Sequence, residues 1–331
     1  MLHRTRLIAF VILLNVIVTA IPVFLVPRDD GNLHPEPTRY ASFLPLGCIE
    51  ITNDSGFHMF TGSGTSYDPY VLEDVKIATG SEIPRISISN TRAHFVIRNC
   101  TFYGTGYGPD DPGGIRLENV SYGDILSCTF TYLRLGIHMT NCSYVNCNSD
   151  LIRMCDTGIL VGGVRNHIVG TALFGMDSGD GIHLHDAYEC LVRNNHVYNY
   201  TVGLRATKTN YSSLVDNLVR NNRIGINLAR DTNSNLVIRN RIGPNEDYNA
   251  IDYGSANQWN SSSVGNQWTD YSGSGSYPIP GEAGSHDYRP SLLVVNPIPW
   301  DLVITGLAGG VIVVSLIFME KRRHKKGGKG L

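Results

Sequence analysis

The chain has 331 residues, with 27 lysine and arginine residues, 29 aspartate and glutamate residues and a formal net charge of −2. Eight of the basic residues lie at the two ends, which leaves 19 basic against 28 acidic residues between the terminal apolar runs. This acidic excess excludes the basic surface that a nucleic-acid-binding protein needs, so no nucleic acid is expected as a partner.

The N-terminal end carries two segments that precede the folded part. Residues 1–27 begin with the basic Arg4 and Arg6 and continue as an apolar run, which predicts a signal peptide or an uncleaved signal anchor. Residues 28–45 are polar, rich in proline and free of any repeat, so they are interpreted as a linker.

The folded domain is expected to span residues 46–290. Short apolar segments start at residue 48, and Gly-Ser and Asp-Pro turns separate them. Residues 46–94 are therefore predicted to form the first coils and to cap one end of the domain, since the terminal repeats of a stack must shield its core from water.

A pattern of glycine, apolar, variable and apolar residues recurs through the regular coils, residues 95–249. Its copies start at Gly114, Gly136, Gly158, Gly181, Gly203 and Gly225, which are 22, 22, 23, 22 and 22 residues apart, and a weaker copy is Ala250-Ile251-Asp252-Tyr253. A fixed period of this length predicts a solenoid. Short strands joined by polar corners make it an all-β parallel β-helix with about 22 residues per coil.

Two kinds of residue are predicted to stack inside the coils. Asn195, Asn217 and Asn240 recur at one position and should form an internal ladder of amide hydrogen bonds. Cys100 and Cys128 occupy that position in earlier coils, where the coil spacing is compatible either with a disulfide or with two buried thiols.

The period fails after residue 249, and the chain then leads to a second apolar run. Residues 250–290 contain Trp259 and Trp268 among Gly, Ser and Asn, and are predicted to form a lid over the last coil. Residues 291–301 are interpreted as a linker. Residues 302–319 would span about 27 Å as a helix, enough to cross a bilayer, and the basic tail, residues 320–331, is predicted to be cytoplasmic.

This membrane topology places the β-helix outside the cell, anchored in the cell membrane through lipid contacts of the two apolar segments. Seven Asn-x-Ser/Thr sequons in the chain are compatible with glycosylation there.

The variable position of the repeat is expected to face outward, because side chains alternate between the two faces of a strand. The predicted ligand-binding residues on this face are Arg116, His138, His183, His185, Arg205, Asn227 and Asp252, with Glu118, Thr140 and Thr207 beside them. A stacked sheet of this kind forms a shallow polar groove for a polysaccharide or an envelope glycoprotein, although an exterior face is also polar for solubility alone. Leu160 interrupts the row, which favours binding over catalysis.

Catalysis and metal binding are the alternatives. Hydrolysis of a sugar linkage needs two carboxylates at a defined separation, and Asp156, Asp177 and Asp180 lie at the corners before the glycines. In a lyase or epimerase, His183 and Arg205 could abstract a proton and neutralise a uronate. His183 and His185 share a strand face and His138 lies two coils away, so these three are the candidate metal ligands, but no third ligand within reach of the pair is evident and no cofactor is expected.

The repeats resemble the NosD-like, carbohydrate-binding-and-sugar-hydrolase type of right-handed parallel β-helix within the pectin-lyase-like superfamily. The resemblance rests on residues 181–202 (GIHLHDAYECLVRNNHVYNYTV), on residues 62–74 (GSGTSYDPYVLED) and on residues 265–281 (GNQWTDYSGSGSYPIPG). Archaeal surface proteins with a C-terminal anchor look similar. The resemblance implies a right-handed coil and a membrane-anchored binding protein, with an enzyme or a metal-binding accessory protein as alternatives, because this superfamily supports many activities.

The resemblance to polygalacturonase-like enzymes is partial. Gly179-Asp180-Gly181 is similar to their acidic corner, but Thr201-Val202-Gly203 stands where a His-Gly is expected, and no Arg-Ile-Lys follows.

Overall fold

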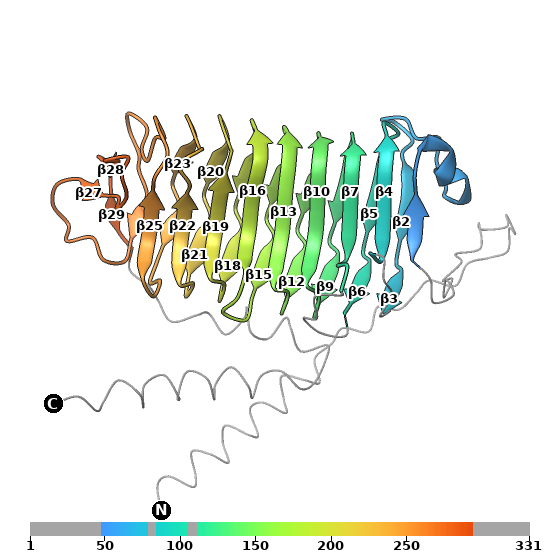
Figure 1. Cartoon of the computed structure of the whole chain (residues 1–331), viewed down its shortest axis with the longest axis horizontal. Coiled ribbons are helices and arrows are strands. Elements are labelled where there is room, and N and C mark those ends of the chain that lie inside the picture. The colour runs from blue at the N-terminus through green and yellow to red at the C-terminus, as the bar shows by residue number, and fades with distance from the viewer. Residues whose placement is uncertain (1–47, 79–83, 105–110, 294–331) are drawn as a thin grey trace, which may run out of the picture. The chain divides into compact units, whose positions relative to one another are not determined.

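A computed structural model describes residues 48–78, 84–104 and 111–293. In these residues the chain winds into an all-β solenoid, in which each strand pairs in parallel with the equivalent strand of the next turn (Figure 1). The predicted parallel β-helix is therefore confirmed. Equivalent residues of the central turns are 22, 22, 23, 22, 22 and 24 residues apart, namely Ile115, Ile137, Ile159, Ile182, Leu204, Ile226 and Ala250.

Three parallel sheets form the walls of the solenoid. The nine-stranded sheet contains, in order, β1 (Ile49–Ile51), β4 (Ile86–Thr91), β7 (Ile115–Val120), β10 (Leu135–Ser143), β13 (Thr157–Val164), β16 (Asp180–Tyr188), β19 (Val202–Thr207), β22 (Ile224–Leu228) and β25 (Tyr248–Asp252). The eight-stranded sheet contains β2 (Tyr70–Glu73), β5 (Phe95–Arg98), β8 (Gly123–Leu126), β11 (Asn146–Asn148), β14 (His167–Val169), β17 (Leu191–Arg193), β20 (Ser213–Val215) and β23 (Leu236–Ile238).

The ten-stranded sheet closes each turn. It contains β3 (Lys76–Ala78), β6 (Thr101–Tyr103), β9 (Thr129–Thr131), β12 (Leu151–Arg153), β15 (Ala172–Phe174), β18 (His196–Tyr198), β21 (Leu218–Arg220), β24 (Arg241–Ile242), β26 (Gln267–Trp268) and β29 (Ser291–Leu292). A separate antiparallel pair joins β27 (Tyr277–Pro278) to β28 (His286–Asp287).

The glycine of the repeat is required by close approach between neighbouring turns. A Cβ atom on Gly181 would lie 2.3 Å from Cγ1 of Val197 and 2.6 Å from the carbonyl oxygen of Gly203. Gly136 would meet the carbonyl oxygen of Gly158 at 2.6 Å. No side chain fits at these distances, so the sequence period follows from the packing of one turn on the next.

The predicted asparagine ladder exists and continues beyond the regular repeat. Oδ1 of Asn217 accepts the backbone N–H of Asn195 at 3.0 Å, and Oδ1 of Asn240 accepts that of Asn217 at 3.0 Å. The ladder continues through two more turns, where Oδ1 of Asn266 accepts the backbone N–H of Asn240 and Oδ2 of Asp287 accepts that of Asn266. In each case a side-chain oxygen of the next turn takes the place of a backbone acceptor for a buried N–H group. The buried polar groups of the ladder therefore remain hydrogen-bonded.

The seven cysteines are free thiols in the structure, so the disulfide alternative for Cys100 and Cys128 is not realised. Both side chains are buried, and the Cys100 thiol donates to the carbonyl oxygen of Arg98 at 3.2 Å. Burial raises the pKa of Cys142 to about 11 and that of Cys155 to about 12. These thiols therefore act as small core residues.

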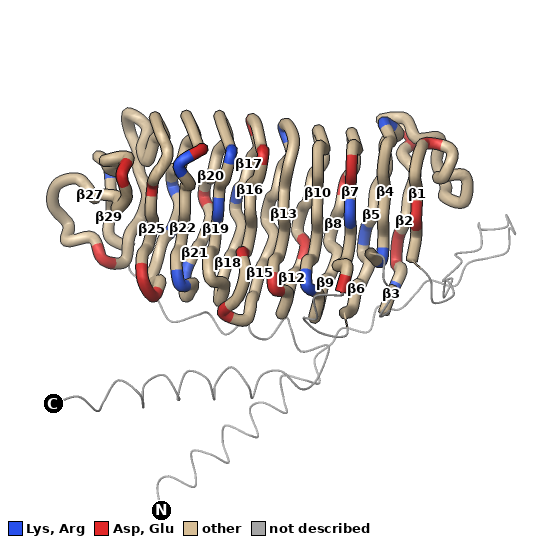
Figure 2. The backbone as a smooth tube through the Cα atoms, in the orientation of Figure 1, with Lys and Arg blue, Asp and Glu red and all other residues tan. Residues whose placement is uncertain are grey.

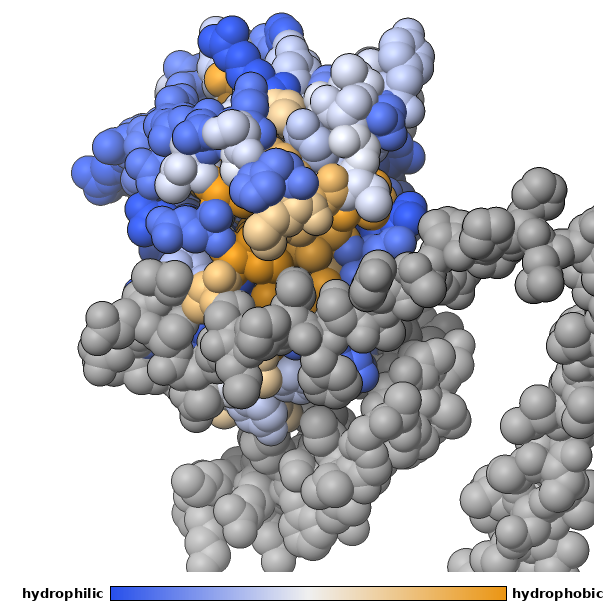
Figure 3. All heavy atoms as spheres, turned by 90° about the vertical axis from the view of Figure 1, so that its right-hand side faces the viewer, coloured by the Kyte–Doolittle hydropathy of each residue, from blue (hydrophilic) through white to orange (hydrophobic). Residues whose placement is uncertain are grey.

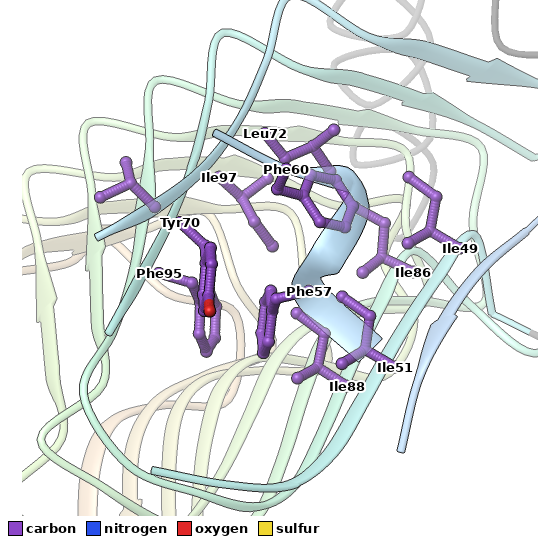
Figure 4. A pocket seen from close by; sticks show the side chains of 11 residues that line it. Ile49, Ile51, Phe57, Phe60, Tyr70, Leu72, Ile86, Ile88, Phe95 and Ile97 are labelled. Atoms are coloured by element: carbon purple, nitrogen blue, oxygen red, sulfur yellow. The ribbon is translucent and has the colours of Figure 1, made fainter. Parts of the chain in front are cut away.

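A short 3-10 helix lies at the N-terminal end of the solenoid. Helix η1 (Asp54–Met59) is capped by Asn53 and places the ring of Phe57 against Tyr70, with centroids 4.8 Å apart, and against Phe95 at 5.6 Å (Figure 4). Apolar side chains remain visible at this end in the space-filling view (Figure 3). Residues 46–94, predicted to be the cap, thus contribute aromatic cover over the first turns.

The C-terminal segment, predicted to be a lid, adds strands as well as aromatic cover. Trp259 and Trp268 are both buried, and Trp268 lies in β26, where it pairs with Ile242. Tyr277 stacks on Trp268 with centroids 4.0 Å apart. The ten-stranded sheet therefore extends into residues 250–290 after the sequence period has failed.

The predicted membrane segments, residues 1–27 and 302–319, lie outside the described residues, as do most of the two linkers and the basic tail. Among the residues that the structure describes, no helix is long and apolar enough to cross a membrane.

Candidate functional site

The outer face of the nine-stranded sheet carries one row of variable residues. From Ser87 to Asn227 each of them lies between two buried apolar neighbours, as His138 does between Ile137 and Met139, and therefore points outward, whereas Ile251 at the end of the row is buried. From β4 to β25 the row consists of Ser87, Arg116, His138, Leu160, His183, Arg205, Asn227 and Ile251. Five of the seven predicted ligand-binding residues occupy it, and His185 lies two positions further along β16.

Asp180 organises the central part of this face. Its Oδ2 lies 3.2 Å from Nδ1 of His183, and its Oδ1 lies 3.0 Å from Nε of Arg205. The three side chains are 13, 20 and 34% exposed, in the order Asp180, His183 and Arg205. The sheet thus brings together three of the five candidate catalytic residues, in a partly desolvated ion-paired cluster.

Thr207 joins the cluster from the neighbouring strand. Its Oγ1 lies 2.9 Å from Nε2 of His183 and 2.8 Å from Nδ1 of His185. His185 in turn contacts Asp186, with Nε2 3.2 Å from Oδ2. A carboxylate, an imidazole and a hydroxyl are therefore linked in sequence. In this arrangement Asp180 orients the ring of His183, and Nε2 of His183 lies within hydrogen-bond distance of the Thr207 hydroxyl.

A second polar group lies two and three coils away from β16, on β10 and β7. Arg116 contacts Glu118 at 3.0 Å, and Figure 2 shows these opposite charges adjoining on β7. Nε2 of His138 lies 3.1 Å from Oγ1 of Thr140. Burial, with the nearby charge of Arg116 and Arg134, lowers the pKa of His138. His138 is thus held neutral near pH 7.

Leu160 and Gly162 separate the two polar groups. Leu160 stands between His138 and His183 in the row, and Gly162 lies on the same strand at a β-bulge, where the register shifts between Val161 and Gly163. The outer face thus carries two polar groups with the apolar Leu160 between them.

Asp252 is not part of the row, and its predicted outward position is wrong. It is 1% exposed, and Oδ2 accepts hydrogen bonds from Nε1 of Trp259 at 2.9 Å and from Oγ of Ser285 at 2.8 Å. The turn before β25 is longer than its predecessors, so that Ala250 pairs with Ile226 and Asp252 with Leu228. A one-residue slip exchanges the two faces of a strand, so Asp252 points inward and holds the C-terminal segment.

The two other candidate carboxylates lie outside the hydrogen-bonded cluster. Asp156 and Asp177 belong to the corners that precede the strands, where the backbone carbonyl of Asp177 accepts a hydrogen bond from Oγ1 of Thr201 at 3.3 Å. Asp177 has the positive φ of 61° that corner residues adopt. Its position is therefore explained by the backbone conformation of the corner.

A family model described as "Periplasmic copper-binding protein (NosD)" matches residues 77–273, which is more than half of the chain and includes the row from Arg116 to Asn227. The chain belongs to the NosD family. No curated protein matches this NosD-family sequence significantly.

Several solved structures resemble the NosD-family solenoid at low identity. A DFA-IIIase from Arthrobacter chlorophenolicus A6 is 13% identical with a TM-score of 0.44, over 64% of this chain and 71% of that one. Pectate lyase Pel9A is 10% identical with a TM-score of 0.41, over 73 and 76%. The Dettilon tailspike protein is 13% identical with a TM-score of 0.37, over 73 and 60%. These similarities carry no information on the site.

The description of the family implies copper, but the described residues do not fit this metal. Within residues 48–78, 84–104 and 111–293, no group of three or more His, Cys, Asp and Glu side chains is placed to hold a metal ion. The rings of His183 and His185 have centroids 5.7 Å apart, and all four ring nitrogens lie beside Asp180, Thr207 or Asp186. His138 lies two coils away, and six of the seven cysteines are buried.

Two contacts of this cluster were not predicted from the sequence, namely the carboxylate of Asp186 beside His185 and the hydroxyl of Thr207 between the two imidazoles. Asp186 follows His185 directly, and a carboxylate at that position could have been noticed as a partner for the imidazole. Thr207 lies 22 residues after His185, which is one turn, so the repeat itself places the hydroxyl beside the ring. The signal in both cases was the register between turns.

Proposed function

We propose that this NosD-family protein binds a polysaccharide along the outer face of its nine-stranded sheet. The observation that carries the proposal is the cluster of Asp180, His183, Arg205 and Thr207, whose side chains are fixed by mutual contacts yet remain partly exposed. Prearranged polar groups of this kind bind a ligand at a low cost in side-chain entropy. Sugar hydroxyls both donate and accept hydrogen bonds, which suits a face that mixes imidazole, guanidinium, carboxylate and hydroxyl groups.

The spacing of the row supports a chain-like ligand. Neighbouring turns are about 4.8 Å apart, close to the length of one sugar residue in an extended polysaccharide. A ligand aligned with the solenoid axis could place successive residues over His183, Arg205 and Asn227. It would extend across Leu160 toward His138 and Arg116.

The cellular setting is part of the proposal. The apolar runs at residues 1–27 and 302–319 and the basic residues after the second run support a membrane-anchored protein with a right-handed β-helix outside the cell. The polysaccharide, or a glycoprotein that carries it, would then belong to the cell envelope. Copper is not proposed as a ligand, because the described residues do not assemble a site for it.

Glycan binding by the full-length protein tests this proposal. The double variant His183→Ala/Arg205→Ala should lose at least about tenfold in affinity for any glycan that the wild type binds, since hydrogen bonds to charged groups contribute about 1.5–3 kcal/mol each. The matched control, His167→Ala/Arg193→Ala, removes the same residue types from the outer face of the eight-stranded sheet and should bind normally. If the wild type binds no glycan, or the control loses as much affinity, the proposal is wrong.

A second candidate function is modification of the polysaccharide, and the chain of Thr207, His183 and Asp180 favours it. With Nδ1 of His183 held by Asp180, Nε2 can accept a proton from a hydroxyl or from an acidic C–H of a uronate, which Arg205 would neutralise. Asp180→Asn should then abolish product formation while leaving glycan binding measurable. Binding without any product from the wild type would exclude this function and leave the binding role.

A further inference from the structure

The outer face of the ten-stranded sheet carries a second group of functional side chains, remote from the row described above. Arg153, Phe174, Tyr198 and Arg220 pair in register on β12, β15, β18 and β21. The rings of Phe174 and Tyr198 stack with centroids 5.2 Å apart and an angle of 5° between their planes. An aromatic pair is thus flanked by one arginine on each side.

Arg220 is buried against this pair without a counter-charge. Its Cζ lies 5.4 Å from the centre of the Tyr198 ring, and the residue is only 8% exposed. Nε of Arg220 is buried and has no hydrogen-bond acceptor among the residues that the structure describes. Burial of a guanidinium donor without a partner costs free energy, which an oxyanion brought to this face would offset.

The surrounding groups add positive charge and no acid. Arg241 lies on the neighbouring strand β24, and among the described residues neither it nor Arg153 forms an ion pair or a side-chain hydrogen bond. By contrast, Arg193, Arg205 and Arg239 each contact an aspartate. Three arginines without acidic partners therefore share one sheet face, in a chain whose central part is acidic.

His196 completes this face beside Tyr198. Its ring lies 6.5 Å from that of Tyr198 in an edge-on arrangement, and burial together with Arg241 and Arg220 lowers the pKa of the histidine. The ring is therefore neutral near pH 7, and one of its nitrogens can donate a hydrogen bond. The positive charge of the face comes from the arginines.

We propose that this face is a second binding site, which takes an oxyanion group through Arg220 and Arg241, with Phe174 and Tyr198 as its apolar floor. A planar guanidinium pairs well with carboxylate, sulfate or phosphate. The oxyanion can belong to an acidic saccharide or be a free anion. The site lies on a different sheet from the proposed polysaccharide row, and does not depend on it.

Titration of the full-length protein with three probes tests this site: a galacturonate trisaccharide, inorganic sulfate and inorganic phosphate. Binding is followed by the NMR signal of the Arg220 Nε–H group and by calorimetry. We expect at least one probe to bind and to shift this signal. Binding of the trisaccharide alone identifies an acidic saccharide, and binding of the inorganic anions as well identifies a general oxyanion site.

The variant Arg220→Met/Arg241→Gln keeps much of the side-chain volume and should weaken this binding at least tenfold. The matched control Arg223→Gln removes an exposed arginine that pairs with Asp247, and should bind as the wild type does. His183→Ala/Arg205→Ala should also leave oxyanion binding intact, which separates this site from the proposed function. Absence of binding by all three probes, or equal affinity in the Arg220→Met/Arg241→Gln variant with an unchanged melting temperature, would overturn the inference.

Discussion

Replacement of Asp150 by asparagine should stabilise the protein. Asp150 occupies the ladder position at which later turns carry Asn195 and Asn217, and its Oδ1 accepts the backbone N–H of Cys128 at 2.8 Å. The residue is 2% exposed, and Oδ2 is buried with no hydrogen-bond partner in the part of the chain that the structure describes. An asparagine at position 150 keeps the acceptor and adds an amide donor. In Asn217, which has the equivalent position, this donor bonds to the carbonyl oxygen of Val192 at 2.9 Å.

The magnitude follows from the cost of burying this carboxyl group. Burial raises the pKa of Asp150 well above its usual value, and each pKa unit corresponds to about 1.4 kcal/mol. A buried polar atom without a partner costs about 1–3 kcal/mol. We therefore expect Asp150→Asn to increase the free energy of unfolding at pH 7 by about 1–3 kcal/mol.

The pH dependence provides the sharper test. Because the folded-state pKa is higher than the unfolded-state value of about 3.9, the folded protein binds the additional proton, and stability falls as pH rises above 4 toward the folded-state pKa. The advantage of the variant should shrink as pH is lowered to 4, in urea unfolding followed by circular dichroism. Asp231→Asn, at an exposed position, is the control and should change little. A destabilised variant at pH 7, or a difference independent of pH, would refute the reasoning.

Three further predictions concern the interior. Asn217→Leu should lower the free energy of unfolding by about 2–4 kcal/mol, because it leaves the N–H of Asn195 and the carbonyl of Val192 without these partners. A loss below about 0.5 kcal/mol, measured by urea unfolding, would show that the ladder is dispensable. Gly181→Ala should cost about 1–3 kcal/mol through its collision with Val197, and an unchanged melting temperature would contradict the packing argument. A thiol reagent at pH 8 should leave the buried cysteines of the folded protein unmodified, and should react with seven thiols once the protein is unfolded in denaturant. Fewer than seven reactive thiols in denaturant would reveal a disulfide.

The sequence predicted the ladder only where the period is regular. Asn195, Asn217 and Asn240 recur at near-constant spacing and were found, but Asn266 and Asp287 continue the same ladder across longer turns. A second ladder through Asn222 and Asn245, with another through Asn235 and Asn257, was not recognised. Asparagine is frequent at turns of any kind, so its presence distinguishes an internal ladder from a surface corner only when the register is known.

The same limit applies to the site. The repeat placed Arg116, His138, His183, Arg205 and Asn227 in one row, because a fixed period with alternating faces determines which residues are neighbours. The repeat gave the wrong face for Asp252, because a longer turn shifts the register there by one residue and exchanges the two faces of the strand.

The sequence by itself therefore determined the solenoid and the identity of its outward row, since both depend on a period that local patterning carries. Only the tertiary structure decided the contacts: that Asp180 lies beside both His183 and Arg205, that Thr207 lies between two imidazoles, and that Nε of Arg220 is buried without an acceptor among the described residues. The contacts of Asp180 with Arg205 and of Thr207 with the two imidazoles join residues about one turn apart, and all of these features depend on side-chain rotamers and burial. Those depend on the packing of whole turns against one another, which no local pattern specifies.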